Sequence, residues 1–117
     1  AEFVTLVSNY EFGNSFSDLL GNGSDLVPIG SGSMTAGGFF FGDGDGLSLD
    51  TNLTSGDYLI ELDVTFANLD GWDKLIDFEN RLQDEGLYVN PTANLLNLYS
   101  YSETSNSSVL VNTPYTI

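Results

Sequence analysis

Apolar side chains occupy every second position of one stretch in the middle of the chain: Tyr58, Ile60, Leu62, Val64 and Phe66. The positions between them are mostly polar and include two carboxylates. A period of two predicts a β-strand with one buried face, here over residues 57–67. Each apolar side chain contributes about 1.5–3 kcal/mol when fully buried, and a slip of one residue would bury the carboxylates instead. We therefore expect this strand to anchor the core in a fixed register.

Short apolar or alternating runs recur along the rest of the chain, separated by Gly, Asn, Asp and Ser. They predict strands at residues 3–10, 26–29, 33–36, 39–41, 47–49, 74–78, 87–89, 95–101 and 109–111, with an ordered loop over 12–26 and a polar loop over 102–108. Strands that recur about every 8–12 residues, with turn signals between them, are typical of antiparallel sandwiches and jelly rolls. We expect one all-β antiparallel β-sandwich domain over residues 1–117.

The chain is strongly acidic, with 17 Asp and Glu against two Lys and Arg and a formal net charge of −15. Such a charge disfavours nucleic acids and anionic membranes, which are bound through clustered Lys and Arg. No run approaches the ~20 apolar residues of a transmembrane helix, so membrane insertion is not expected. Because the chain lacks Cys and His, disulfides and thiolate or imidazole metal ligands are excluded. The remaining oxygen ligands suit calcium or magnesium.

An Asp-Gly-Asp-Gly segment places two carboxylates, Asp43 and Asp45, on a short loop. Together with nearby carbonyl groups they could supply several oxygen ligands to a calcium ion. The spacing of an EF-hand is not met, because Thr54 stands where that loop requires a carboxylate. The alternative is a hairpin turn that joins strands 39–41 and 47–49 and uses glycine for its positive φ angles.

Asp70, Trp72 and Asp73 lie in a predicted turn that contains the only Trp of the chain. An aromatic ring beside carboxylates is typical of sugar-binding rims, where the ring stacks and the carboxylates accept hydroxyl hydrogen bonds. The alternative is that Trp72 only packs at the edge of the sheet. The two cations, Lys74 and Arg81, lie among five carboxylates along the chain, which favours local ion pairing over ligand recognition.

Several short motifs follow one another in order along the chain: Tyr10-x-Phe12, Ser17-Asp18, the segments 21–26 and 41–49, the strand residues 58–62, and the long segment 71–89. Their order and spacing resemble laminin-G-like modules of the concanavalin A-like superfamily, especially the bacterial secreted versions. The resemblance implies a jelly-roll fold and recognition of glycan or matrix, with calcium at the rim.

The chain departs from that family at its end. Laminin-G-like modules usually continue with further strands where this chain stops at Ile117, so the resemblance implies that roughly the last third is missing. A jelly roll without those strands would expose a sheet edge. We expect a fragment, a sheet that another chain or a second copy completes by strand addition, or a variant that closes in a reduced form.

Glucanases with the same fold carry a Glu-x-Asp-x-Glu strand, which the segment from Glu61 through Asp63 to Thr65 resembles. Glycoside hydrolysis requires two carboxylates that flank the scissile bond. The third acidic position is Thr65 here, so one member of the pair is absent and an enzyme is not expected.

These observations lead to three functional hypotheses. The first is a non-catalytic extracellular recognition or adhesion module that binds glycan or matrix, assisted by calcium. The second is a structural subunit of an extracellular filament, appendage or surface layer, assembled by strand complementation between chains. The third is a degenerate glycoside hydrolase. A secreted location is expected because disulfide-free, acidic chains rich in Gly, Asn and Ser are typical of bacterial exported proteins.

Overall fold

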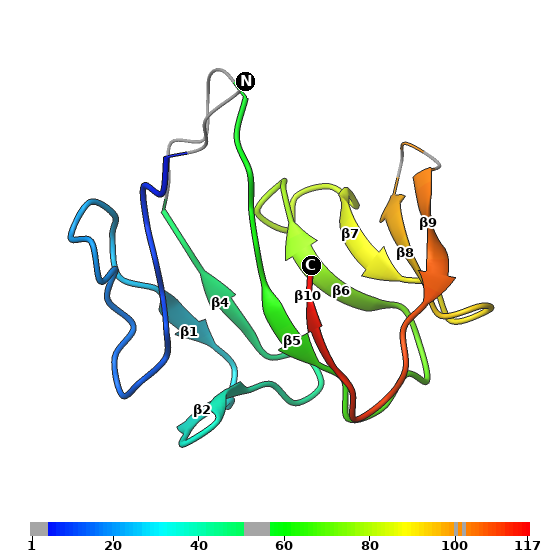
Figure 1. Ribbon diagram of the computed structural model, residues 1–117, viewed down its shortest axis with the longest axis horizontal. Coiled ribbons are helices and arrows are strands. Elements are labelled where there is room, and N and C mark those ends of the chain that lie inside the picture. Colours follow the sequence, from blue (N-terminus) through cyan, green and yellow to red (C-terminus); the bar gives the residue numbers. More distant parts are fainter. Residues whose placement is uncertain (1–4, 51–56, 100, 102) are drawn as a thin grey trace. The chain divides into compact units, whose positions relative to one another are not determined.

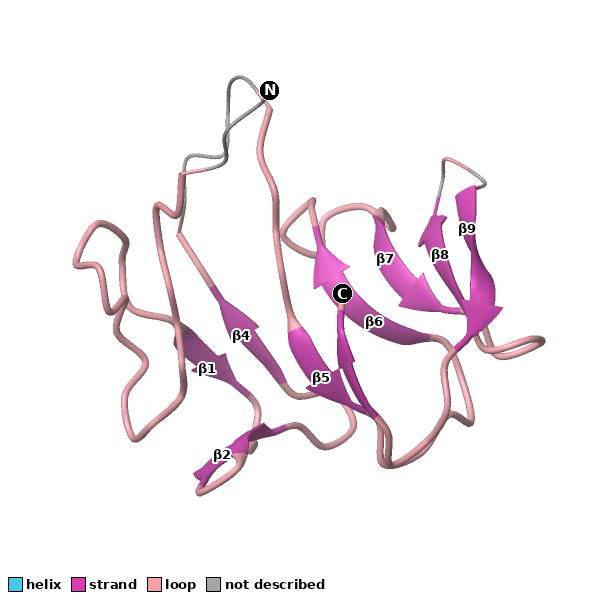
Figure 2. Ribbon diagram, viewed as in Figure 1, coloured by secondary structure: helices cyan, strands magenta, loops and turns pink. Residues whose placement is uncertain are grey.

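The computed structural model describes residues 5–50, 57–99, 101 and 103–117, and all regular structure in them is β-strand with antiparallel pairing (Figure 1). This all-β architecture confirms the predicted class and is consistent with a β-sandwich. The colouring in Figure 2 shows strands joined by turns and loops, without a helix in the described ranges. A helix able to span a membrane is accordingly not found among these residues. The chain divides into two compact units, residues 1–59 and 60–117.

In its described residues, 5–50 and 57–59, unit 1 contains four strands of three residues each: β1 (Val27–Ile29), β2 (Ser33–Thr35), β3 (Gly38–Phe40) and β4 (Gly46–Ser48). All four strands were predicted from short apolar or alternating runs, with boundaries that differ by at most one residue at each end. Two separate antiparallel ladders form, because β1 pairs with β4 and β2 pairs with β3.

The predicted hairpin between residues 39–41 and 47–49 is wrong, since the two strands in these regions take other partners. A hairpin forms instead between β2 and β3, which a two-residue loop connects from Thr35 to Gly38. Gly38 has a positive φ of 126°. The Asp-Gly-Asp-Gly segment still turns the chain, because the backbone N–H of Asp45 donates to the carbonyl of Gly42 at 3.1 Å.

One carboxylate organises residues 5–26, which precede β1 without forming a strand and which we call the loop of unit 1. Asp18 Oδ1 accepts hydrogen bonds from the backbone N–H groups of Asn9 (2.8 Å) and Leu20 (3.0 Å). Its Oδ2 accepts from those of Asn22 (2.9 Å) and Gly23 (2.8 Å). The hydrogen bond from Asn9 and those from the other three amides hold the pKa of Asp18 far below its ordinary value, although partial desolvation opposes this. Asp18 is 7% exposed, and it is the only buried side chain in the described part of unit 1.

The same contacts account for a failed prediction at the start of the chain. Residues 5–10 form no strand, and residues 3 and 4 lie outside the described part. Asn9 is bound to Asp18 through its N–H and accepts a hydrogen bond from Leu19 N at 2.8 Å, so its backbone groups are used within the loop. The loose alternation of this segment is overridden by polar contacts.

The part of unit 2 that the structure describes, all but residues 100 and 102, contains six strands: β5 (Asp63–Thr65), β6 (Asp73–Asp77), β7 (Gly86–Val89), β8 (Leu95–Tyr99), β9 (Glu103–Ser108) and β10 (Pro114–Thr116). Four of them form a sheet in the order β6-β7-β8-β9, in which every neighbour follows in sequence (Figure 1). The remaining pair, β5 and β10, makes a separate antiparallel ladder.

The predicted central strand is confirmed in part. The alternation of half-buried and exposed positions holds from Ile60 to Phe66, with the apolar positions inward, but Tyr58 is 55% exposed. Regular structure is limited to β5, and reciprocal 2.8 Å hydrogen bonds between Leu62 and Ile117 extend its ladder with β10. The strand is therefore shorter than its apolar pattern.

The core of unit 2 is small and is built around Phe66, Val89 and Val109. Val89 is completely buried. Five partly buried side chains pack against these three: Val64, Leu69, Leu75, Leu96 and Tyr115. The ladder of β5 and β10 and the four-stranded sheet thus share one apolar interior.

The last predicted strand is misplaced. Residues 109–111 form no strand, although Val109 is buried, whereas the expected polar loop after residue 102 is β9. β9 consists of Glu, Thr, Ser and Asn, so it has no apolar alternation to reveal it. Ser105 instead accepts a hydrogen bond from Leu96 N at 2.9 Å through its hydroxyl oxygen, which ties β9 to β8.

Candidate functional site

Three aromatic rings meet on the outer face of the four-stranded sheet. Tyr88 lies opposite Lys74 in β6, and Tyr99 lies opposite Gly86 in β7. Side chains alternate along a strand, so Tyr88 points away from the side on which its neighbour Val89 enters the core. We call the surface formed by Trp72, Lys74, Tyr88 and Tyr99 the aromatic face.

The rings of the aromatic face are packed edge to face. The Trp72 ring centre lies 5.7 Å from that of Tyr88, at an interplanar angle of 88°, and 6.5 Å from that of Tyr99, at 72°. Tyr88 and Tyr99 are 5.9 Å apart at 78°. This is the geometry that aromatic quadrupoles favour. Trp72 remains 52% exposed and Tyr99 43% exposed, so ring surface is left for a ligand.

A β-bulge in β6 brings a carboxylate to the same face. The register shifts between Lys74, opposite Tyr88, and Ile76, opposite Leu87, so β6 carries one extra residue at this point. Without the shift, residues three apart in a strand would point to opposite sides. The shift instead allows Asp77 Oδ2 to lie 2.8 Å from Lys74 Nζ.

Lys74 is the centre of a polar cluster on the aromatic face. Besides Asp77, its Nζ lies 3.4 Å from Asp84 Oδ1 and 4.9 Å from the centre of the Tyr88 ring, a cation–π contact. The Tyr88 hydroxyl also hydrogen-bonds to Asp84 Oδ1. Lys74 is thus bound to two carboxylates and one ring.

These contacts shift the pKa values of Asp77 and Lys74. Partial burial raises the pKa of Asp77, but hydrogen bonds from the backbone N–H of Arg81, from Lys74 and from the backbone N–H of Glu79 lower it more, so the net pKa is depressed. Partial burial lowers the pKa of Lys74, and its interactions with Asp77 and Tyr88 outweigh this and raise it. Both groups are therefore held ionised.

Replacing Lys74 with Met is expected to raise the pKa of Asp77, because the carboxylate loses a charged hydrogen-bond donor. The pair is partly exposed, so the free energy of unfolding should fall by less than about 1 kcal/mol. An NMR titration of the Asp77 carboxyl group measures the first effect, and Lys74→Arg, which retains the charge, is the control. An unchanged titration in Lys74→Met would contradict the assigned pairing.

The bulge requires a glycine in the neighbouring strand. Gly86 is buried opposite Asp77, and a Cβ atom added there would collide with the carbonyl oxygen of Ile76 and lie 3.3 Å from Lys74 Cε. The distance to this oxygen would be much shorter than van der Waals contact allows, so an alanine could not occupy position 86 without a shift of the backbone. The missing side chain of Gly86 thus lets the bulged strand and Lys74 pack against β7.

An open hollow of about 440 Å³ borders this cluster. It is lined by Lys74, Asp77, Arg81, Leu82, Gln83 and Asp84. Asp77 shapes its wall, because Oδ1 accepts hydrogen bonds from the backbone N–H groups of Glu79 (2.9 Å) and Arg81 (3.0 Å). The hollow therefore contains both hydrogen-bond donors and acceptors, and Lys74 belongs to it as well as to the aromatic face.

The structure separates the three residues predicted to bind sugar. Trp72 lies in the aromatic face, Asp70 is exposed in the preceding turn, and Asp73 is half-buried and pairs with Val89, on the core side of the sheet. Tyr88 and Tyr99 were not predicted to be neighbours of Trp72. Both tyrosines lie in predicted strands, at alternate positions whose side chains point away from the core. The sequence does not show how these strands pair, so it could not predict that the two rings meet.

The two residues predicted to bind calcium lie in the turn before β4. Asp45 Oδ1 accepts from Ser31 N at 2.7 Å, and Oδ2 accepts from Gly42 N at 2.8 Å. These hydrogen bonds, led by that of Ser31, lower the pKa of Asp45, although desolvation opposes them. Asp43 is exposed, and the described residues contain no group of three or more His, Cys, Asp or Glu placed to hold a metal ion. Calcium binding stays a prediction.

The glucanase-like positions lie on the exposed side of β5 and of the residues just before it. Glu61, Asp63 and Thr65 alternate with the inward apolar row, as the pattern predicted. Asp63 Oδ1 accepts a 2.6 Å hydrogen bond from the Thr116 hydroxyl of β10. This contact uses Asp63 to join the two strands of the ladder.

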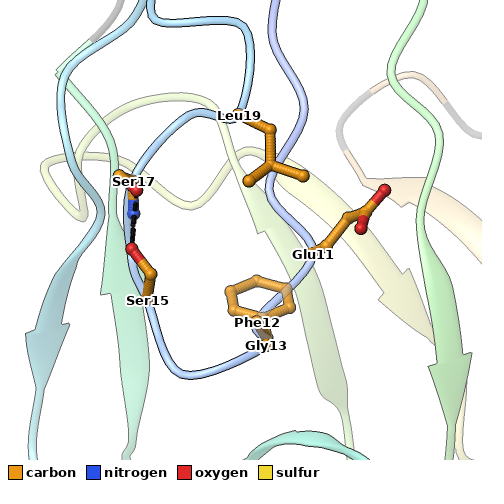
Figure 3. A pocket seen from close by; sticks show the side chains of 6 residues that line it. All are labelled: Glu11, Phe12, Gly13, Ser15, Ser17 and Leu19. Carbon is orange, nitrogen blue, oxygen red and sulfur yellow. Dashed lines mark hydrogen bonds between the residues drawn. The ribbon is translucent and has the colours of Figure 1, made fainter.

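A second hollow, of about 230 Å³, lies in the loop of unit 1 (Figure 3). It is lined by Glu11, Phe12, Gly13, Ser15, Ser17 and Leu19. The hydroxyl groups of Ser15 and Ser17 hydrogen-bond to each other at 2.6 Å, while Glu11 accepts from the Asn9 side chain at 3.0 Å. Figure 3 shows the serines and Glu11 on different arms of the loop, so this carboxylate does not activate either hydroxyl.

Comparison with known proteins gives no match to a family model, to a curated protein or to a solved structure. Any functional conclusion therefore depends on the geometry of the chain itself, and the aromatic face is the surface best suited to bind a ligand.

Proposed function

We propose that this chain is a non-catalytic extracellular recognition module that binds a glycan on its aromatic face. The observation that carries the proposal is the pair of half-exposed rings, Trp72 and Tyr99, held at fixed angles by Tyr88. Rigid aromatic side chains offer a large contact area at a low cost in conformational entropy. They would stack on the apolar faces of sugar rings.

The polar groups beside the rings would orient the sugar. Asp77 and Asp84 can accept hydrogen bonds from hydroxyl groups, and Arg81 and Gln83 can donate to ring and hydroxyl oxygens.

The proposed fold is a concanavalin A-like jelly roll of the laminin-G-like kind, and the proposed setting is a secreted matrix or adhesion protein in which calcium assists binding. The antiparallel all-β architecture supports the first part. The acidic composition supports a role for divalent cations, which would reduce the repulsion within a surface of net charge −15.

Trp72→Ala is expected to weaken glycan binding by about ten-fold or more, because an exposed aromatic anchor is lost. A glycan array followed by calorimetry on the best ligand measures the effect. Trp72→Phe should retain part of the affinity, and Tyr101→Ala, which removes an exposed aromatic side chain outside the cluster, should not change it. Absence of any saturable glycan binding by the unmodified chain would refute the proposed function.

A second function, a subunit assembled by strand complementation, is favoured by one observation. β9 is an outer strand of its sheet, has six residues, and contains neither Pro nor Lys to block pairing with another chain. The proposed partner is a second copy of the chain that adds a strand to this edge.

Assembly predicts a particle heavier than 12.6 kDa in light scattering, which Asn106→Lys in β9 should reduce to the monomer because a charge at a sheet edge opposes pairing. The control is Asn14→Lys, which makes the same change of charge in the loop of unit 1. A monomer in the unmodified chain would exclude self-assembly under these conditions, and a particle dissociated equally by both variants would show that charge, not the β9 edge, controls it.

A further inference from the structure

The charge around the aromatic face restricts which glycans it can accept. Between residues 70 and 85 the chain carries six carboxylates and two cations, and the net charge of the whole chain is −15. Exposed charges of one sign repel a ligand of the same sign over roughly a Debye length, about 10 Å at 0.1 M salt. An anionic glycan would thus approach against the field of the protein.

Lys74 does not relieve this repulsion. Its Nζ is already bound to Asp77 at 2.8 Å and lies 3.4 Å from Asp84 and 4.9 Å from the centre of the Tyr88 ring. A sulfate or carboxylate of a ligand would have to displace these partners. The cation of the aromatic face is therefore already held by these partners. The other cation of the chain, Arg81, lines the adjoining hollow, and six carboxylates between residues 70 and 85 oppose its attraction for an anion.

A sugar can stack on the exposed aromatic rings without carrying a charge. Trp72 and Tyr99 are exposed and lie 6.5 Å apart, so one glycan chain could contact both. Asp84 is 65% exposed at its side chain and is an acceptor for neutral hydroxyl groups. The apolar and polar contacts on this surface both suit an uncharged sugar.

We propose that the aromatic face selects uncharged polysaccharides and discriminates against uronic acid and sulfated glycans. This inference rests on the proposed function, since it names the ligand class of the same site. It assigns Asp77 and Asp84 two roles: they neutralise Lys74 and accept hydrogen bonds from neutral sugars.

The test compares a neutral glucose hexasaccharide with a glucuronic acid hexasaccharide of the same linkage, by calorimetry at low and high salt. We expect the neutral chain to bind at least about ten-fold tighter at low salt, and the ratio to fall as salt screens the repulsion. Binding of the neutral chain should depend on Trp72.

Asp84→Asn provides a matched variant, because it loosens Lys74 while leaving the hydrogen bonds of Asp77 to the turn intact. It should raise the affinity for the anionic hexasaccharide several-fold, whereas Asp43→Asn, the same charge change in the exposed turn of unit 1, should not. Equal or tighter binding of the anionic chain to the unmodified protein, or no difference between the two variants, would overturn the inference but leave the proposed function. Absence of Trp72-dependent binding by either sugar would overturn both.

Discussion

Gly86→Ala is expected to destabilise unit 2 by about 1–3 kcal/mol, because the new methyl group has no space beside the bulge in β6. Its Cβ would collide with the carbonyl oxygen of Ile76 and press on Lys74 Cε. The backbone must move to relieve the collision, since a carbonyl oxygen cannot rotate away as the end of a side chain can. We also expect the ion pair between Lys74 and Asp77 to be disturbed, because the bulge creates it.

Urea unfolding of Gly86→Ala and of the unmodified chain measures the change in free energy. Gly71→Ala is a suitable control, because a Cβ at Gly71 would meet no atom within 4 Å. The control should change the free energy by no more than about 0.5 kcal/mol. Equal unfolding midpoints for the two variants would show that the bulge does not depend on a glycine at position 86.

Asp18→Asn is expected to disorder the loop of unit 1. The amide side chain is of the same size, but an NH2 group would replace one of the two oxygens that accept four backbone hydrogen bonds. Two N–H donors would then face another donor, and leaving such groups without an acceptor is more costly than losing one ordinary hydrogen bond. Hydrogen exchange at Asn9, Leu20, Asn22 and Gly23 should become faster.

The same loop should respond to pH. The pKa of Asp18 is depressed in the folded state, so its contribution to stability is complete above the ordinary value of about 3.9 and is lost as pH falls toward the lower folded value. The protection of the four amides, measured relative to their intrinsic exchange rates at each pH, should therefore fall only in acid. Asp25→Asn, an exposed substitution in the same loop, should leave exchange near neutral pH unchanged. Slow exchange in Asp18→Asn would mean that the carboxylate does not hold the loop.

The hydrophobic pattern predicted where most strands lie but not how they pair. Alternation located β5 and the inward position of Phe66, since it reports the burial of side chains. Pairing depends instead on turns and polar contacts, so the hairpin between residues 39–41 and 47–49 was predicted wrongly. β9 was missed because its Ser and Thr side chains bind through hydroxyl groups, which leave no apolar signal.

The candidate site was predictable at two residues, Trp72 and Lys74, and the predicted local ion pairing of Lys74 is confirmed. Trp72 was identified because a lone Trp beside carboxylates is conspicuous in a sequence. Its neighbours Tyr88 and Tyr99 are brought to it by cross-strand register, and the position of Asp77 depends on a bulge. A one-residue irregularity of this kind cannot be read from a period of two, because it changes the parity of every position after it.

The role of Asp18 has a consequence for how this chain can vary in evolution. In most domains apolar core positions are the ones that resist substitution, yet in the described part of unit 1 the only buried side chain is a carboxylate. Many different residues should therefore be tolerated at the exposed leucines and valines of this unit, and few at Asp18. Sequence divergence in unit 1 would be limited by hydrogen-bond acceptors, and in unit 2 by the volumes of Phe66, Val89 and Val109.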